Sequence, residues 1–232
     1  LANTNYQATL LRSISSDPNP NGPGIVEINA DEYFKPVKLP SRHQSINPGS
    51  YAETTKPLSV AFKNSIRVDV NVFSTLLTDH LQSIISWGPM RITLNKNGYV
   101  AFHFDDEEII TSKEPIIVDR WYSISIKISK DQKTDLCVRE NLTGRQDQTN
   151  TENLKCSIDL NEFESAKIRL ATDQSKTDFF NGKIEAPEVK VDGETILKYD
   201  FSQQITLFTV PAAIGPPLML YNSPTRAVKG MN

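Results

Sequence analysis

Alternation of apolar and polar residues is the dominant pattern in the chain, and it predicts β-strands. The clearest run, 121–129, places a tyrosine and three isoleucines on one face, as in a half-buried strand. Residues 65–72 repeat this pattern. Residues 183–191 alternate more loosely around Pro187, which predicts an edge strand or a bend because proline donates no ladder hydrogen bond.

A β-hairpin is predicted over 92–104, where two apolar stretches flank Asn95-Lys96-Asn97-Gly98. The Asn97-Gly98 pair supplies the positive φ angles that a tight hairpin turn requires. Only one short helix is predicted, at 161–165. Shorter strands are predicted at 7–14, 37–39, 50–54, 83–87, 108–111, 135–139, 155–159, 166–170 and 195–201.

These elements predict an all-β fold, an antiparallel β-sandwich rather than alternating strands and helices. We expect the sandwich to cover 1–202, with a first strand and a turn-rich connector in 1–24 and the body in 25–202. Residues 140–153 are predicted to form a polar loop. Residues 203–232 are expected to be an extended proline-rich tail, laid on a neighbour or leading to another domain, because prolines interrupt any continuous ladder there.

Charge and composition narrow the classes of partner. With 25 Lys+Arg against 28 Asp+Glu, the formal charge is −3, so no whole-chain attraction to nucleic acid or to anionic membranes is expected. No apolar run approaches the length of about 18 residues that a spanning helix needs. The first residues carry no signal-peptide pattern, so we expect a cytoplasmic protein and leave secretion open, treating the chain as a fragment.

Two cysteines, Cys137 and Cys156, are too few for a disulfide scaffold or a thiolate zinc site. They flank the polar segment 140–153. If their two stretches pair as a hairpin, a disulfide between them is possible; the alternative is a pair of reduced, buried thiols. Whether they are joined stays open. The glycosylation triplet at Asn141 matters only in a secreted protein.

A catalytic or metal site is not indicated by any local motif. His43, His80 and His103 are far apart in sequence, and His103 is expected to be a solvated strand residue on the face opposite its neighbouring phenylalanines. The acidic run 105–108 lacks the spaced ligands of a calcium loop and is expected to be solvated. No nucleophile elbow or phosphate-binding glycine loop is present. We therefore predict no catalytic, cofactor-binding or metal-binding residue in this chain.

Aromatic side chains offer the other kind of chemistry, a stacking platform for a sugar or a peptide. Trp87, just before Gly88-Pro89 at a strand end, is the ring that we expect to be exposed. In a strand that contains Trp121-Tyr122, and likewise at Phe179-Phe180, at least one ring of each pair must face the core. The candidate rings are Trp87, Tyr99, Trp121, Tyr122, Phe179 and Phe180.

An ordered set of motifs spans almost the whole chain: Ala8–Arg12, Ser16–Gly24, Pro48–Glu53, Ser86–Trp87, Asn97–Phe102, Arg120–Ile124, Phe180–Pro187, Tyr199–Ser202 and Asn222–Val228. In this order the motifs resemble the N-terminal half of the large subunit of bacterial N,N-dimethylformamidase and its relatives. The resemblance implies a concanavalin-A-like, laminin-G-like jelly roll. It also implies an iron held by a Tyr, a Glu and a His in a separate C-terminal domain, so no iron ligand is assigned to this chain.

The residues of these motifs make structural sense. Gly49 and Gly182 are suited to bends or to a close approach of strands, and Tyr51 offers a buried ring with a polar tip. Arg226, held among prolines in the tail, is a candidate for a charge-assisted bond at a domain interface. The motif residues expected to be structural are Gly49, Ser50, Tyr51, Trp121, Asn181, Gly182 and Pro224.

The main functional hypothesis is a non-catalytic, lectin-like accessory domain of a dimethylformamidase-like amidohydrolase. Its expected partners are the missing catalytic domain and other subunits of the parent enzyme. The alternative is a free-standing laminin-G-like lectin module that binds carbohydrate or calcium. A third hypothesis, a glycoside hydrolase, requires two facing carboxylates about 5–10 Å apart in a groove. Fold by itself does not choose among them.

Overall fold

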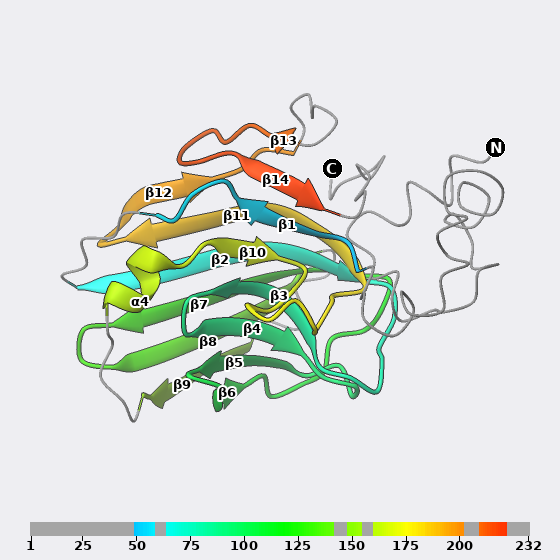
Figure 1. The fold of residues 1–232 in the computed structure, drawn as a ribbon. Coiled ribbons are helices and arrows are strands. Elements are labelled where there is room, and N and C mark those ends of the chain that lie inside the picture. The colour runs from blue at the N-terminus through cyan, green and yellow to red at the C-terminus, as the bar shows by residue number, and fades with distance from the viewer. Residues whose placement is uncertain (1–48, 59–63, 142–147, 155–159, 202–208, 222–232) are drawn as a thin grey trace, which may run out of the picture.

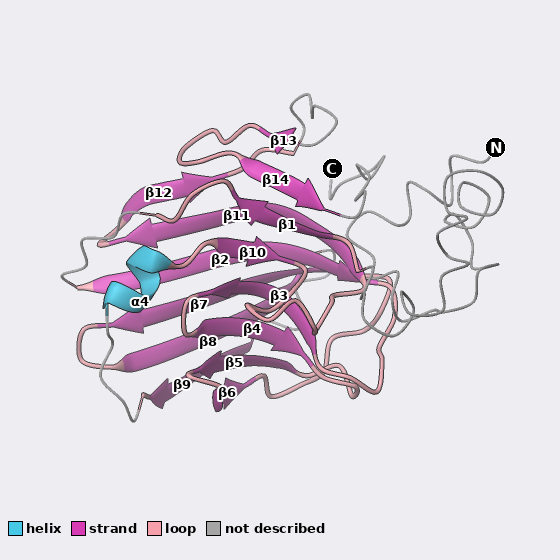
Figure 2. Cartoon of the chain, viewed as in Figure 1, coloured by secondary structure: helices cyan, strands magenta, loops and turns pink. Residues whose placement is uncertain are grey.

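The computed structural model describes residues 49–58, 64–141, 148–154, 160–201 and 209–221. Within them the chain forms two antiparallel sheets that stack face to face, as Figure 1 shows. Strands and loops make up nearly all of the described chain (Figure 2). No described helix is long and apolar enough to cross a membrane. The expected all-β antiparallel sandwich is confirmed.

The larger sheet, sheet A, has eight strands and the smaller, sheet B, has six. In spatial order sheet A contains β13 (Thr209–Val210), β14 (Leu218–Tyr221), β1 (Tyr51–Thr54), β10 (Ile168–Leu170), β3 (Gln82–Trp87), β4 (Met90–Leu94), β5 (Val100–Phe104) and β6 (Glu107–Thr111). Sheet B contains β12 (Glu194–Lys198), β11 (Gly182–Val191), β2 (Ser65–Ser74), β7 (Trp121–Ser129), β8 (Lys133–Glu140) and β9 (Gln148–Asn153).

The core lies between the sheets, because every second side chain of each long strand points inward. In β2 and β7 the buried positions alternate with half-buried or exposed ones, as the sequence predicts. The short helix α4 (Leu160–Ser165) matches the predicted 161–165, and its Phe163 is fully buried against the core.

The predicted hairpin is confirmed as β4 and β5, but its turn differs from the expected one. Only Gly98 has a positive φ, of 84°. The turn is held instead by the Asn95 side chain, whose Oδ1 accepts hydrogen bonds from the backbone N–H groups of Asn97 and Tyr99, both at 3.0 Å. An asparagine side chain that bonds to the backbone two residues on can take the place of the second left-handed residue.

Pro187 marks a bend and not an edge. β11 lies between β12 and β2, and its pairing with β2 shifts register between Glu185 and Glu188. Ala186, just before the proline, has a φ of 48°. The bulge takes the proline out of the ladder, which is how a central strand tolerates it.

Two segments predicted to lie outside the sheets contribute strands. β9 falls within the predicted 140–153 loop, where its polar sequence shows no alternation, and it pairs with β8 as the edge of sheet B. Within 203–232, β13 and β14 join sheet A, so the sandwich extends past the predicted boundary at residue 202 to at least Tyr221. Pro211, Pro216 and Pro217 lie between these two short strands. The predictions for 1–48, 155–159 and 222–232 fall outside the described residues.

Gly49 and Gly182 stand where strands and rings approach closely, as the sequence predicts. A Cβ on Gly182 would lie 2.2 Å from the backbone oxygen of Phe73. One on Gly49 would lie 2.1 Å from the Phe179 ring. Neither contact is possible without moving the neighbour, so a side chain at either position forces the backbone apart.

Replacing Gly182 with alanine is therefore expected to lower the free energy of unfolding by about 1–3 kcal/mol. Gly193→Ala is the matched control, because no atom lies within 4 Å of a Cβ there and only the φ of +85° is unfavourable. Urea denaturation of both variants measures the difference. A Gly182→Ala variant as stable as the wild type would contradict the close approach.

Candidate functional site

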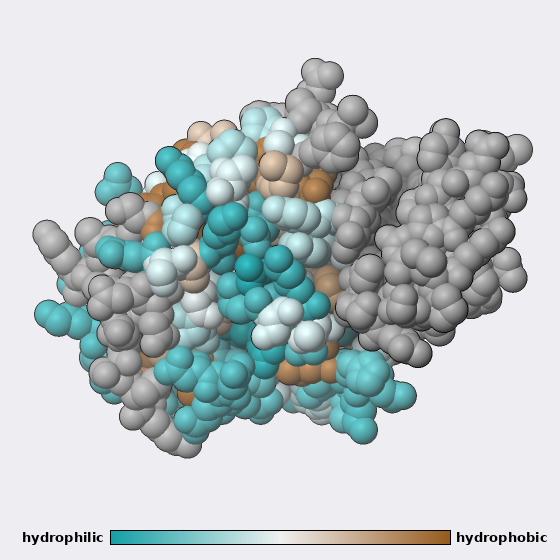
Figure 3. Space-filling model, in the orientation of Figure 1, coloured by the Kyte–Doolittle hydropathy of each residue, from teal (hydrophilic) through white to brown (hydrophobic). Residues whose placement is uncertain are grey.

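A row of polar side chains crosses the outer face of sheet A. Successive strand pairings place Glu53 beside Arg169, then Ser86, Arg91 and His103. Figure 3 shows hydrophilic residues gathered over the middle of the face on which β1, β10, β3 and β4 lie. Because this row crosses five strands, it is the first candidate for a functional site.

At one end of the row, Glu53 is buried between two cations. Its carboxylate accepts from Arg169 Nε at 2.6 Å and from Lys167 Nζ at 3.1 Å. Burial raises the pKa of Glu53, but the hydrogen bonds and charges of Arg169 and Lys167 outweigh it and hold that pKa below its ordinary value. Glu53 is therefore ionised and paired at neutral pH.

The segment 171–178 packs across the middle of the row. Asp173 shapes it by accepting backbone hydrogen bonds from Ser175, Thr177 and Asp178. Asp178 in turn forms an ion pair of 3.0 Å with Arg91. The charged groups of this row thus bind one another and stabilise the segment, which leaves few of them to recognise a ligand.

His103 is buried, 7% exposed, and not solvated as predicted. Its ring lies opposite the neighbouring phenylalanines, as expected, but Nε2 is 3.0 Å from Thr93 Oγ1. Burial, followed by the charge of Arg91, lowers the pKa of His103. A neutral histidine bonded to a threonine is a structural group.

The acidic run that follows is exposed, as predicted. Asp105 and Asp106 form the turn between β5 and β6, with φ angles of 51° and 62°. All four side chains of 105–108 are exposed. The described part of the chain contains no group of three or more His, Cys, Asp or Glu side chains placed to hold a metal ion.

Trp87, the ring expected to be exposed, is buried, with 1% of its surface accessible. It faces the core at the end of β3, where its Nε1–H donates to the backbone oxygen of Phe163 at 3.1 Å. The two rings meet edge to face, with centroids 4.9 Å apart. The prediction of Trp87 as a ligand-binding ring is therefore wrong, because α4 covers the strand end that was expected to be open.

Trp121 is the ring that sheet B presents outward. It is half-buried and stands opposite Phe73 in the β2–β7 pairing. Their centroids are 5.5 Å apart and their planes are tilted by 56°. Lys183 of β11 places its ammonium 4.7 Å from the centre of the Phe73 ring. Phe73 thus supports the tryptophan and is itself covered by the lysine, so Trp121 is the ring left for stacking.

A row of amides and a hydroxyl runs beside these rings. Asn71 is paired with Ser123 across β2 and β7, and Ser123 Oγ lies 2.7 Å from Asn71 Oδ1 and 2.8 Å from Asn141 Oδ1. A hydroxyl has a single hydrogen to donate, so one of the two amides must present its NH2 group to Ser123 instead. The three side chains form a polar chain on the outer face.

We call Phe73, Trp121, Asn71, Ser123 and Asn141 the platform of sheet B. Its strands β2 and β7 are central in that sheet, and strands lie about 4.8 Å apart, so the platform has a rigid base. The indole N–H of Trp121 donates to none of the described residues, in contrast to the internally paired charges of sheet A. An open ring beside amides and a hydroxyl can stack on a ligand and bond to it.

Other residues singled out in the sequence are structural or lie outside the described residues. Tyr122, Phe179 and Phe180 are buried. Tyr51 stacks on Tyr221 with centroids 4.7 Å apart. Ser50 and Asn181 are also buried, while Pro224 and Arg226 lie beyond the described chain, so the interface predicted at Arg226 stays a prediction.

Cys137 stands opposite Thr149 of β9 and opposite Ser125 of β7. At Cys137, β8 therefore pairs with β7 on one side and with β9, residues 148–153, on the other. Cys156 lies outside the described residues. The segment that pairs with the Cys137 stretch as a hairpin is thus β9, which does not contain Cys156, and whether the two cysteines are joined stays open.

No protein-family model matches the chain, and no curated protein matches it in sequence. Among solved structures, a protein from Bacteroides ovatus that is provisionally described as carbohydrate-binding is 14% identical, with a TM-score of 0.54 over 76% of this chain and 59% of that one. The LG1–3 region of the laminin α2 chain is 16% identical, with a TM-score of 0.47 over 63% of this chain and 31% of that one.

This chain thus spans less than two thirds of either protein. At these identities the likeness concerns the fold and not the function. Together with the two stacked antiparallel sheets, the likeness to the Bacteroides protein confirms the predicted fold class, an antiparallel β-sandwich of the concanavalin-A-like, laminin-G-like jelly-roll type.

Proposed function

We propose that this chain is a lectin-like module that binds carbohydrate on the platform of sheet B. The observation that carries the proposal is the half-buried Trp121 ring, which has no hydrogen-bond partner among the described residues for its indole N–H. It lies on a central strand beside the polar chain of Asn71, Ser123 and Asn141. The outer face of sheet A, with its paired charges, offers no comparable opening.

The chemistry of a sugar fits this arrangement. The C–H groups on one face of a pyranose ring can pack against an indole, while its hydroxyls require partners that both donate and accept. Amide and hydroxyl side chains meet that requirement without a net charge. The description of the similar Bacteroides protein as carbohydrate-binding agrees with the proposal but concerns that protein.

The finer hypothesis, an accessory domain of an N,N-dimethylformamidase-like enzyme, rests on the ordered sequence motifs alone. Under it the platform would belong to a non-catalytic domain, and the iron and the amide hydrolysis would belong to a C-terminal domain beyond this chain. This hypothesis requires that a longer parent protein hydrolyse formamide and bind iron. It also requires that this chain alone do neither.

Replacing Trp121 with alanine tests the carbohydrate proposal. A glycan array first identifies the saccharide bound by the wild-type chain, and calorimetry then compares the variants. We expect the dissociation constant of Trp121→Ala to rise at least tenfold, equivalent to about 1.4 kcal/mol. Trp121→Phe, which keeps a ring but loses the N–H, is expected to lie between the two.

Ser125→Ala is the matched control, because Ser125 lies on the same strand face four residues from Trp121. It should leave affinity unchanged. The proposal fails if no saccharide on the array is bound, or if Trp121→Ala binds as well as the wild type while remaining folded.

A further inference from the structure

Arg139 of β8 lies beside the platform of sheet B, one strand further along. In the β7–β8 pairing it stands directly opposite Ser123, and directly paired residues present their side chains on one face of a sheet. Asn141, two residues later, donates its backbone N–H to the Trp121 oxygen at 3.0 Å. Trp121, Ser123, Arg139 and Asn141 therefore occupy four neighbouring positions on the outer face.

The side chain of Arg139 is within reach of a ligand that stacks on Trp121. Across two paired strands, directly opposite Cβ atoms are about 5 Å apart and diagonal neighbours about 7–8 Å apart. Arg139 is opposite Ser123 and diagonal to Trp121. Long side chains span a diagonal of this length, so a substituent of a sugar on the indole ring can meet the guanidinium.

The guanidinium of Arg139 is available, whereas the other cations next to the platform are engaged. Lys183 lies over the Phe73 ring, and Arg120 forms an ion pair of 3.3 Å with the buried Glu140. Arg139 is exposed and forms no hydrogen bond or ion pair with any residue that the structure describes. Its N–H donors are therefore free to bind a ligand.

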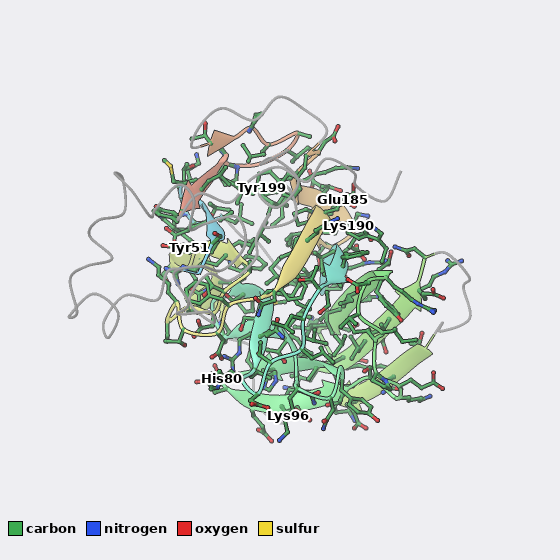
Figure 4. All side chains as sticks on the ribbon, turned by 90° about the vertical axis from the view of Figure 1, so that its right-hand side faces the viewer. Tyr51, His80, Lys96, Glu185, Lys190 and Tyr199 are labelled. Atoms are coloured by element: carbon green, nitrogen blue, oxygen red, sulfur yellow. The ribbon has the colours of Figure 1, made fainter. Side chains whose placement is uncertain are left out.

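The acidic side chain of the same row stands at the opposite end. Glu185 of β11 is paired with Asn71 of β2, so three strand spacings of about 4.8 Å, about 14 Å in all, separate it from Arg139. Figure 4 shows Glu185 on β11, away from Tyr51 of sheet A. Glu185 thus lies too far along the row to neutralise the guanidinium by direct contact.

From this placement we infer that the saccharide is acidic: it carries a carboxylate, as a hexuronic acid does, and Arg139 binds that group while the sugar ring lies on Trp121. A guanidinium presents parallel N–H donors that match the two oxygens of a carboxylate. The inference rests on the proposed function, because it names the class of saccharide that binds at the same site.

The test compares hexuronides with the neutral hexosides of the same configuration, both as methyl glycosides. Calorimetry at low ionic strength gives the ratio of their dissociation constants. For the wild type we expect a hexuronide to bind about tenfold more tightly than its hexoside. Because Arg139 is exposed, the ratio should shrink as sodium chloride is raised from about 0.05 to about 0.5 M.

In Arg139→Ala, the hexuronide should bind no more tightly than the hexoside. Arg139→Lys keeps the charge but loses the fork of donors, so it should retain part of the advantage. Lys127→Ala is the matched control, because Lys127 is also exposed on the outer face of sheet B, four residues from Ser123. It should keep the wild-type ratio. Trp121→Ala should weaken both glycosides, and circular dichroism establishes that each variant is folded.

The outcomes separate the two proposals. Equal binding of hexuronide and hexoside by the wild type overturns the acidic ligand and leaves the carbohydrate platform standing. So does an advantage that persists in Arg139→Ala, or one that Lys127→Ala abolishes. A hexose sulfate that binds more tightly than the hexuronide, and loses this gain in Arg139→Ala, overturns the carboxylate in favour of a sulfate. If no glycoside and no saccharide on the array binds, the carbohydrate proposal itself is overturned, and the acidic ligand with it.

Discussion

Replacing Trp87 with alanine is expected to lower the free energy of unfolding by about 3–5 kcal/mol. The ring is buried at the end of β3, contacts Phe163 edge to face, and donates a hydrogen bond to the Phe163 oxygen. Its removal leaves a cavity and a backbone oxygen without its donor, two costs that add. Denaturant unfolding followed by circular dichroism measures the loss.

Trp87→Phe separates these two costs. It keeps most of the packing and loses the indole N–H, so we expect a smaller loss, about 1–3 kcal/mol. A further control is Trp121→Ala, whose ring is half-buried on the outer face and whose loss should cost less than that of Trp87. If Trp87→Ala unfolds at the same denaturant concentration as the wild type, the position of α4 over this ring is wrong.

Replacing Glu53 with alanine is expected to have the second largest effect, a loss of about 2–4 kcal/mol at neutral pH. Glu53 is 6% exposed, and Arg169, its partner at 2.6 Å, is 16% exposed. Removing the carboxylate leaves a largely buried guanidinium with one fewer acceptor. Lys167 is 35% exposed and can turn to water, so it adds less.

The pH dependence of stability tests the same group. The folded-state pKa of Glu53 lies below its ordinary value of 4.5. Its contribution is therefore present above about pH 4.5 and is lost as the pH falls through the lower folded-state pKa. The wild type should lose stability over this range more steeply than Glu53→Gln, which has no carboxylate to protonate.

Glu194→Gln is the control for this measurement, because Glu194 is exposed on β12. It should follow the wild-type curve. The predicted role of Glu53 would be contradicted by a Glu53→Gln curve that runs parallel to the wild-type curve through the acidic range.

The long alternating strands were predictable, whereas three strands, β9, β13 and β14, were not predicted. In β2 and β7 one face is packed on the core and the other is not, so burial leaves a two-residue pattern in the sequence. β9 is a polar edge strand stabilised by its backbone pairing with β8. β13 and β14 are short and are separated by prolines, so neither shows a pattern long enough to detect.

The orientation of the aromatic residues was likewise predictable where the strand alternates and unpredictable where a distant segment decides it. Alternation requires that Trp121 and Tyr122 face opposite sides, and β7 obeys it, with Tyr122 in the core. For Trp87 the proximity of Gly88-Pro89 predicted an open strand end. That prediction failed because α4, more than 70 residues later in the chain, covers the ring, and no local pattern reports such a contact.

By itself the sequence determined the class of fold and, within the long strands, which side chains share a face, since both follow from a two-residue period that local chemistry enforces. Only the tertiary structure decided which strands that are far apart in the chain are neighbours. Phe73 meets Trp121, and Asn71 meets Ser123, because β2 and β7 pair in one register. That register depends on the packing of two whole sheets, so the platform comes from long-range contacts rather than from any single stretch of the chain.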